Sequence, residues 1–97
     1  MEEYLATIAG WFVKGTLTQF QIAFKHYLAS EGYAVERQGD ALLFYRIRKE
    51  GGFLGIGRKT LKEPVMKIIE GEEGVQIPPK PLDEEFVQRL ASYVAQR

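Results

Sequence analysis

The stretch that decides the fold covers residues 41–70 and reads ALLFYRIRKEGGFLGIGRKTLKEPVMKIIE. Both flanks are rich in aromatic and branched apolar residues, and the middle is rich in glycine, which is typical of two strands joined by a chain reversal. We expect strands at 41–49 and 60–70. Because Pro64 has no N–H group to donate, we expect its part of the second strand to lie at a sheet edge or a bulge.

Shorter strands are predicted on both sides of this hairpin. Residues 33–37 show a strand pattern and precede a tight turn at 38–40, and residues 75–77 show another after a turn at 71–74. Strands joined by such short connections pair in antiparallel fashion. We therefore predict an antiparallel sheet of three or four strands.

Alternation within the first long strand separates its two faces. Leu43, Tyr45 and Ile47 fall on one face, because successive side chains of a strand point to opposite sides. The other face begins apolar and becomes basic at Arg46 and Arg48. We expect the first half of this strand in the centre of the sheet and the second half to emerge into water.

Three segments show the spacing of apolar residues that is typical of helices, at 2–14, 17–31 and 83–96. Asp83 suits the cap at the start of the third helix. Since the strands lie between the second and third helices, the order indicates an α+β fold. We predict a single α+β domain over residues 1–97, with two N-terminal helices and one C-terminal helix packed on the sheet.

The composition excludes several functional classes. The chain has no cysteine and one histidine, which excludes cysteine chemistry and multi-histidine metal sites. We predict no enzymatic activity, no cofactor and no metal. No apolar run approaches the ~20 residues that span a bilayer, and the acidic start Met1-Glu2-Glu3 argues against a signal peptide. We expect a cytoplasmic protein without a membrane partner.

The charge is balanced in total and uneven along the chain. Lysine and arginine together number 13, as do aspartate and glutamate. Residues 41–62 hold six basic side chains against Glu50 alone, an excess of five positive charges on one predicted hairpin and its loop. Cations on a hairpin can follow a nucleic-acid backbone, and an aromatic ring can stack on a base. Our first hypothesis is a small binding domain that contacts RNA or DNA phosphates through Arg46, Arg48, Lys49, Arg58, Lys59 and Lys62, with Phe53 as the stacking ring.

Two structural interpretations compete with this hypothesis. The charges would also keep an edge strand from pairing with other chains, or they would pair within the fold with the acidic C-terminal helix. A second functional hypothesis is a protein-interaction or self-associating module, because clustered aromatic and apolar side chains often anchor interfaces. Its candidate residues are Trp11, Phe12, Phe53 and Ile56, with packing inside the fold as the structural alternative for each.

The loop carries a resemblance to a known family. Gly52-Phe53-Leu54-Gly55-Ile56-Gly57, followed by Lys59, resembles the GFLGIG signature of the Jag N-terminal domain, which stands at the front of bacterial Jag-type RNA-binding proteins. The family's order of helix, strand, glycine turn and returning strand can be laid on residues 17–69, although this chain adds a strand pair before the loop and a C-terminal helix. The resemblance implies a small accessory or binding domain. It does not carry RNA binding with it, because separate modules of that family make the RNA contacts.

Overall fold

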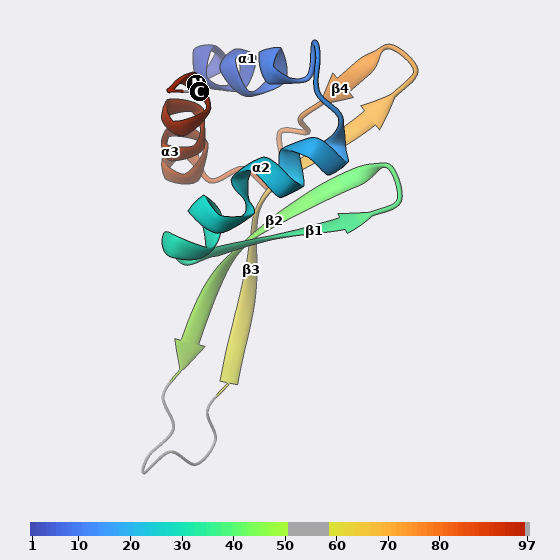
Figure 1. Cartoon of the computed structure of the whole chain (residues 1–97). Helices are drawn as coiled ribbons and strands as arrows, with labels where there is room; N and C mark the ends of the chain where they lie inside the picture. Colours follow the sequence, from blue (N-terminus) through green and yellow to red (C-terminus); the bar gives the residue numbers. More distant parts are fainter. Residues whose placement is uncertain (51–58, 97) are drawn as a thin grey trace.

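The computed structural model of the chain describes residues 1–50 and 59–96 (Figure 1). It confirms the predicted α+β fold, with four strands in an antiparallel sheet and three helices in the described ranges. In chain order the elements are α1 (Glu2–Trp11), α2 (Leu17–Ser30), β1 (Tyr33–Gln38), β2 (Ala41–Glu50), β3 (Lys59–Gly71), β4 (Gly74–Gln76) and α3 (Glu84–Ala95).

The sheet is a meander in the order β1-β2-β3-β4, each strand antiparallel to its neighbours. β4 pairs only with the end of β3, from Ile69 to Gly71, so the part of β3 around Pro64 has β2 on one side alone. The register between β2 and β3 shifts between Phe44 and Tyr45, next to the pairing of Tyr45 with Pro64. Both expectations for Pro64 are therefore confirmed, since it lies at an edge and beside a bulge.

Caps define the ends of two helices. Thr16 accepts a hydrogen bond from the backbone N–H of Gln19 through its hydroxyl, and the Gln19 side chain accepts one from the N–H of Thr16. This reciprocal arrangement satisfies two N–H groups that have no partner inside the helix. Asp83 caps α3 as predicted, because its carboxylate accepts from the N–H of Phe86. Gly32 follows α2 with a φ of 85°, a conformation that favours glycine.

The first helix is shorter than the prediction of 2–14. It ends at Trp11, and its last turn tightens as the N–H of Phe12 bonds to the carbonyl of Ala9 at 3.0 Å. The chain then doubles back over the indole of Trp11. A Cβ atom at Gly15 would lie only 2.0 Å from that ring, so this close approach requires glycine.

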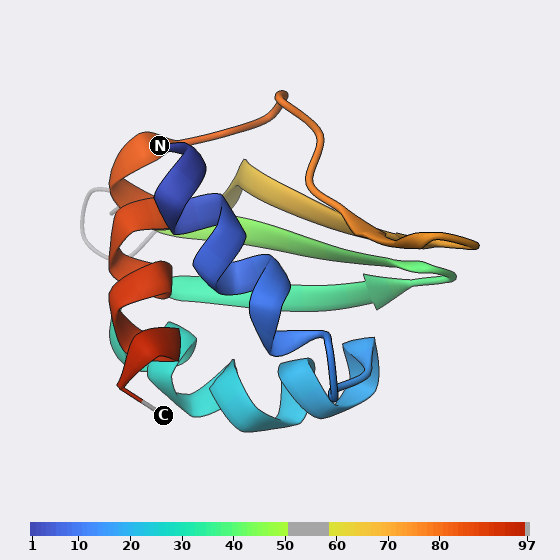
Figure 2. The ribbon, with the colours of Figure 1, turned by 90° about the horizontal axis from the view of Figure 1, so that it is seen from above.

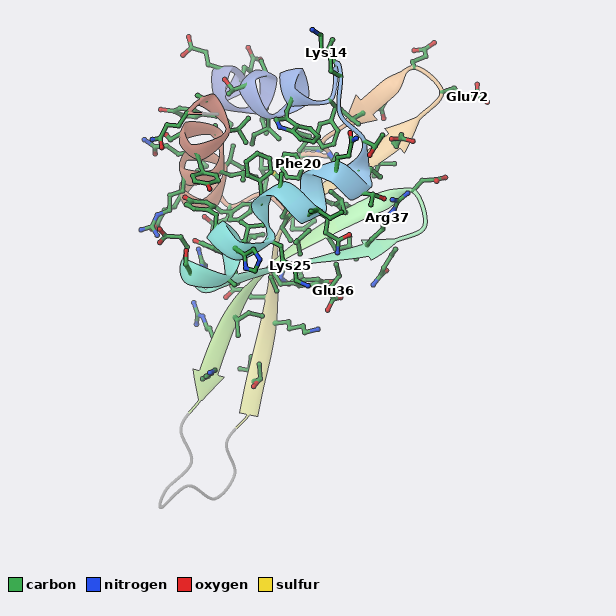
Figure 3. The ribbon with its side chains drawn as sticks, viewed as in Figure 1. Lys14, Phe20, Lys25, Glu36, Arg37 and Glu72 are labelled. Carbon is green, nitrogen blue, oxygen red and sulfur yellow. The ribbon has the colours of Figure 1, made fainter. Side chains whose placement is uncertain are left out.

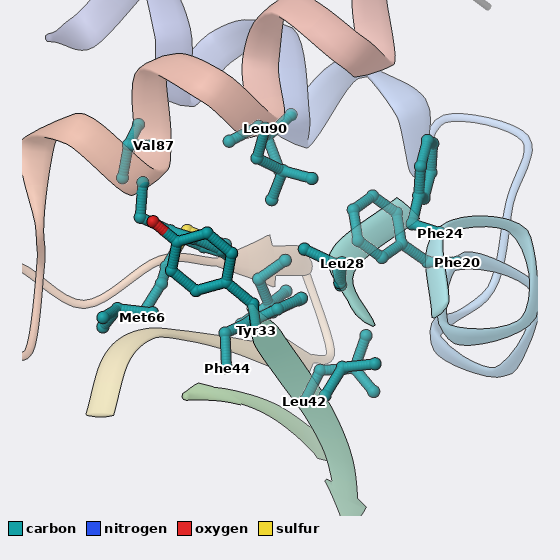
Figure 4. Close-up of a cluster of buried hydrophobic side chains, with 14 of the residues drawn as sticks. Phe20, Phe24, Leu28, Tyr33, Leu42, Phe44, Met66, Val87 and Leu90 are labelled. Carbon is teal, nitrogen blue, oxygen red and sulfur yellow. The ribbon is translucent and has the colours of Figure 1, made fainter. Parts of the chain in front are cut away.

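The three helices cover one face of the sheet (Figures 1 and 2). α1 packs on α3, and α2 packs on β1. The core lies between the helices and the strands (Figure 4), where Phe44 and Met66 on the sheet meet Leu90 on α3. The fully buried side chains of largest volume are Phe20, Phe24, Phe44, Phe86, Ile8, Leu17, Leu28, Leu42, Met66, Ile68, Leu90 and Val65.

The N-terminal aromatic residues extend this core. The Trp11 ring lies 5.1 Å from that of Phe20 and 5.8 Å from that of Phe24, both edge to face. Phe12 stacks on Phe20 at 5.0 Å. Trp11 and Phe12 are half-buried, so most of their apolar surface is used inside the fold.

Candidate nucleic-acid interface

The β2–β3 hairpin continues beyond the helix-covered part of the protein, which we call the body. The sheet pairing of β1 with β2 ends at Arg46, followed by one hydrogen bond of 2.9 Å from the N–H of Ile47 to the carbonyl of Gly32. Beyond Arg46, residues 47–50 pair in the sheet with residues 59–62. We call these two segments the ribbon. Figure 1 shows the ribbon leaving the body on the side away from α1, with none of the described helices over it. Arg48, Lys49, Thr60, Leu61 and Lys62 are exposed, and Ile47 is half-buried.

Arg48 and Lys49 are the exposed cations of the ribbon on β2. The Arg48 side chain is 60% exposed, and its Nε lies 3.2 Å from Oε2 of Glu63, whose side chain is 47% exposed. Lys49 is also exposed. Ion pairs this open to water contribute about 0–1 kcal/mol, so a phosphate can replace the carboxylate at little cost. Leu61, which pairs with Arg48 across the ribbon, is 41% exposed.

Arg46 has a different environment, although it lies on the same face two residues earlier. Its side chain is 25% exposed, and its Nη2 donates to Oδ2 of Asp83 at 2.9 Å. The guanidinium also lies 5.8 Å from the Tyr33 ring centroid. Arg46 therefore connects β2 to the start of α3, which agrees with the interpretation that a cation of this hairpin pairs with the acidic C-terminal helix.

Two hydrogen-bond donors stabilise the carboxylate of Asp83. The N–H of Phe86 donates a hydrogen bond to Oδ1 at 3.0 Å, and the guanidinium of Arg46 donates one to Oδ2. Together these hydrogen bonds lower the pKa of the Asp83 carboxyl. Both donors favour the ionised form. The Arg46–Asp83 pair is therefore a structural element at the base of the ribbon, and we exclude it from the exposed interface.

Lys62 lies on the opposite face of the ribbon from Arg48. It pairs with Ile47 across the strands, and its ammonium forms an ion pair with Glu36 on β1. The hydrogen bond to Glu36 raises the pKa of Lys62. The ammonium also lies 5.8 Å from the centre of the Tyr45 ring. Arg48 and Lys62 thus lie on opposite faces of the ribbon rather than together on one.

The remaining predicted residues divide into two groups. Phe53, Ile56 and Arg58 lie outside the described residues, and Lys59 is the first residue of β3. Trp11 and Phe12 stand at the end of α1, the helix that Figure 1 shows on the side of the body away from the ribbon. The structure therefore does not bring the N-terminal aromatic residues and the loop residues of the protein-interaction hypothesis together on one described surface.

One feature of the sheet was missed by the sequence prediction. A hollow of about 240 Å³ lies beside the bulge and is lined in part by Tyr45, Pro64 and Lys67. The alternation of β2 already placed Tyr45 on a face with Leu43 and Ile47. Its pairing with Pro64 and the approach of Pro81 depend on the tertiary structure.

Over the ranges 1–50 and 59–96, no three histidine, aspartate or glutamate side chains gather in a way that would hold a metal ion. None of the helices in those ranges combines the length and the hydropathy that crossing a membrane requires.

The chain matches no protein-family model, no curated protein and no solved structure. The resemblance of residues 52–57 to the Jag N-terminal signature stays a prediction, and those residues lie outside the described ranges.

Proposed function

We propose that this protein is a small non-enzymatic, cytoplasmic nucleic-acid-binding domain, in which the ribbon and the adjoining glycine-rich segment contact RNA or DNA phosphates. One observation carries the proposal: the ribbon extends beyond the helix-covered body and presents Arg48 and Lys49 to solvent. Arg46 serves the fold instead. The contacts we propose are therefore those of the outer hairpin.

The charge of the ribbon supports this function. Residues 47–50 and 59–62 include Arg48, Lys49, Lys59 and Lys62 against Glu50, four positive charges and one negative. Arg58 adds another next to them in the sequence. Each cation that neutralises a phosphate releases a condensed counterion, which is the main source of affinity in non-specific binding. A two-stranded ribbon also has the dimensions to enter the major groove of a duplex.

The length of the ribbon needs an explanation beyond folding. β2 and β3 span 10 and 13 residues, whereas strands in globular proteins average about 5–6. Two strands without a third neighbour or a covering helix are marginally stable, so the outer part of the hairpin adds little to the stability of the fold. A role in binding accounts for a basic extension of this kind. Protection of an edge strand accounts for the charge but not for the length.

The test measures binding together with its salt dependence. Fluorescence anisotropy of labelled single-stranded and duplex oligonucleotides would be followed from about 50 to about 200 mM salt. We expect affinity to fall steeply over this range. The double variant Arg48→Gln/Lys49→Gln should reduce the slope of log K against log[salt] by about 2, since it removes two phosphate contacts.

The matched control is Lys14→Gln. Lys14 is an exposed lysine at the other end of the molecule from the ribbon (Figure 3), so its neutralisation should leave the slope unchanged. Absence of binding to any oligonucleotide at the lowest salt would overturn the proposal. An equal loss of affinity with Lys14→Gln and with the ribbon variant would also contradict it, because only the net charge would then matter.

A further inference from the structure

The sheet has a second face that none of the described helices covers. The helices lie on the face of Phe44 and Met66, and antiparallel partners point to the same side. The opposite face, which we call the open face, runs into the ribbon without a break, because Ile47 and Lys62 belong to both. Its residues include Ala34, Glu36, Gln38, Ala41, Leu43, Tyr45, Ile47, Lys62, Pro64, Lys67, Ile69 and Gln76.

Tyr45 is the aromatic centre of the open face. Its ring is half-buried and lies outside the aromatic contacts of the core, whereas Phe44, the preceding residue, contacts both Phe20 and Phe86. The hollow of about 240 Å³ beside Tyr45 is smaller than the ~300–1,000 Å³ of pockets that enclose a whole drug-sized ligand. It offers room for one planar ring system laid against the tyrosine and Pro64.

Cations flank this ring on two sides. Lys62 places its ammonium 5.8 Å from the ring centre, and Lys67 lines the hollow with Tyr45. Among the described strand residues of the open face, one is a carboxylate, Glu36, and it forms an ion pair with Lys62. An aromatic platform between cations suits a ligand that has a flat ring and a negative charge close together, which describes a nucleotide unit.

We infer that the ligand is a single-stranded nucleic acid, and that a base stacks on Tyr45 while the backbone continues along Lys62 to the ribbon. This inference rests on the proposed function and specifies its substrate. A duplex keeps its bases stacked on one another, so only an unpaired strand presents a base face to a side chain on an open sheet. Lys67 then takes the phosphate on one side of the stacked base. Lys62 takes the phosphate on the other side in exchange for Glu36, because that ion pair is open to water, with side chains 50% and 38% exposed.

The test compares single strands of RNA and of DNA, each of about 12 nucleotides, with a duplex of equal length. Tyr45→Leu removes the ring and keeps an apolar side chain in the strand. Loss of one base–aromatic stack corresponds to a fall in affinity of about 5- to 150-fold for both single strands, with duplex binding unaltered. Tyr45→Phe should restore most of this affinity, because stacking does not require the hydroxyl group. A 2-aminopurine base in the strand should be quenched on binding to the wild type and to Tyr45→Phe, and less by Tyr45→Leu.

Tyr4→Leu is the matched control, because Tyr4 is a half-buried tyrosine on α1 that packs against the core. The affinity of the Tyr4→Leu variant for single strands should equal that of the wild type. Circular dichroism would verify that Tyr4→Leu and Tyr45→Leu are both folded.

Three results would overturn the inference. If duplex binds as tightly as single strands, and Tyr45→Leu affects neither, the ribbon binds nucleic acid and the open face does not, so the proposed function survives alone. If Tyr45→Leu converts a dimer to a monomer in analytical ultracentrifugation, the open face joins two copies of the chain. If no oligonucleotide binds the wild type at low salt, the proposed function itself fails.

Discussion

The body and the ribbon use the same strand in different ways. Arg46 and Arg48 lie two residues apart on one face of β2, and both approach Glu63. The guanidinium of Arg46 is mostly buried and holds Asp83 at the start of α3, whereas that of Arg48 is mostly exposed. The same side chain therefore stabilises the fold at one position and is available to a ligand at the next.

This difference teaches that position relative to the helices, rather than charge, assigns the role of each residue. Where α3 reaches the sheet, a cation is enclosed between elements and its partner is fixed. Beyond that point the strands have neither a third neighbour nor a described helix over them. Substitutions in the helix-covered core should therefore change stability without changing binding, and substitutions of exposed side chains in the ribbon should do the opposite.

The largest effect on stability is expected in the core beneath the helices. Phe44 is completely buried between Phe20 and Phe86, and Phe44→Ala should lower the free energy of unfolding by about 3–5 kcal/mol. Leu61→Ala, in the ribbon, should change it by less than about 0.5 kcal/mol, as at an exposed site. Urea unfolding followed by the fluorescence of Trp11, the one tryptophan of the chain, measures both. Comparable losses at the two sites would show that the ribbon is part of the cooperative body.

A smaller effect is expected where the chain passes Trp11. Gly15→Ala places a Cβ atom 2.0 Å from the indole ring, and the resulting displacement should destabilise the protein by about 1–3 kcal/mol. Gly10→Ala is the matched control, because open space surrounds that position in α1. It should stabilise the protein by up to about 1 kcal/mol through helix propensity. Urea unfolding measures the free energy of unfolding of both variants. If Gly15→Ala left this free energy unchanged, the close packing of Gly15 on Trp11 would be contradicted.

The pair at the base of the ribbon predicts a dependence on pH. Because the folded state lowers the pKa of Asp83, its contribution is complete above the carboxyl's ordinary value and is lost as pH falls below it. Asp83→Asn keeps a capping side chain and removes the charge, and should cost about 1 kcal/mol at pH 7. The difference in the free energy of unfolding between Asp83→Asn and the wild type should narrow as pH falls below about 4. A constant difference across that range would exclude the Arg46–Asp83 charge interaction as its source.

The smallest effect on stability is expected in the ribbon itself. Arg48→Gln/Lys49→Gln removes one exposed ion pair and should shift the free energy of unfolding by less than about 0.5 kcal/mol. The same variant is expected to change the salt dependence of nucleic-acid binding. A large loss of stability without a change in binding would reverse the assignment of body and ribbon.

Most of the fold was predictable because its determinants are local. The alternation in β2, the cap at Asp83 and the position of Pro64 each follow from spacing or from a missing donor over a few residues, and the structure agrees with all three. The end of α1 was predicted three residues too late. The chain reverses there over Trp11. The packing of Gly15 on that ring cannot be predicted from the spacing of apolar residues along the helix.

The candidate site was less predictable. The sequence grouped six cations by proximity, but the structure joins Arg46 to a carboxylate 37 positions away and Lys62 to one 26 positions away. Such partners depend on how α3 and β1 dock on the sheet. Tyr45 and Lys67 were overlooked for a related reason, since their significance arises from the absence of a described helix over one face.

By itself, the sequence determined the order of helices and strands, the basic character of the long hairpin and the alternation of its side chains, because these depend on residue type and short-range spacing. Only the tertiary structure decided which cations are enclosed, which face of the sheet stays open and how far the hairpin extends beyond the helices. Those properties arise from contacts between segments distant in the chain, whose free energies depend on burial and on the distance between charges.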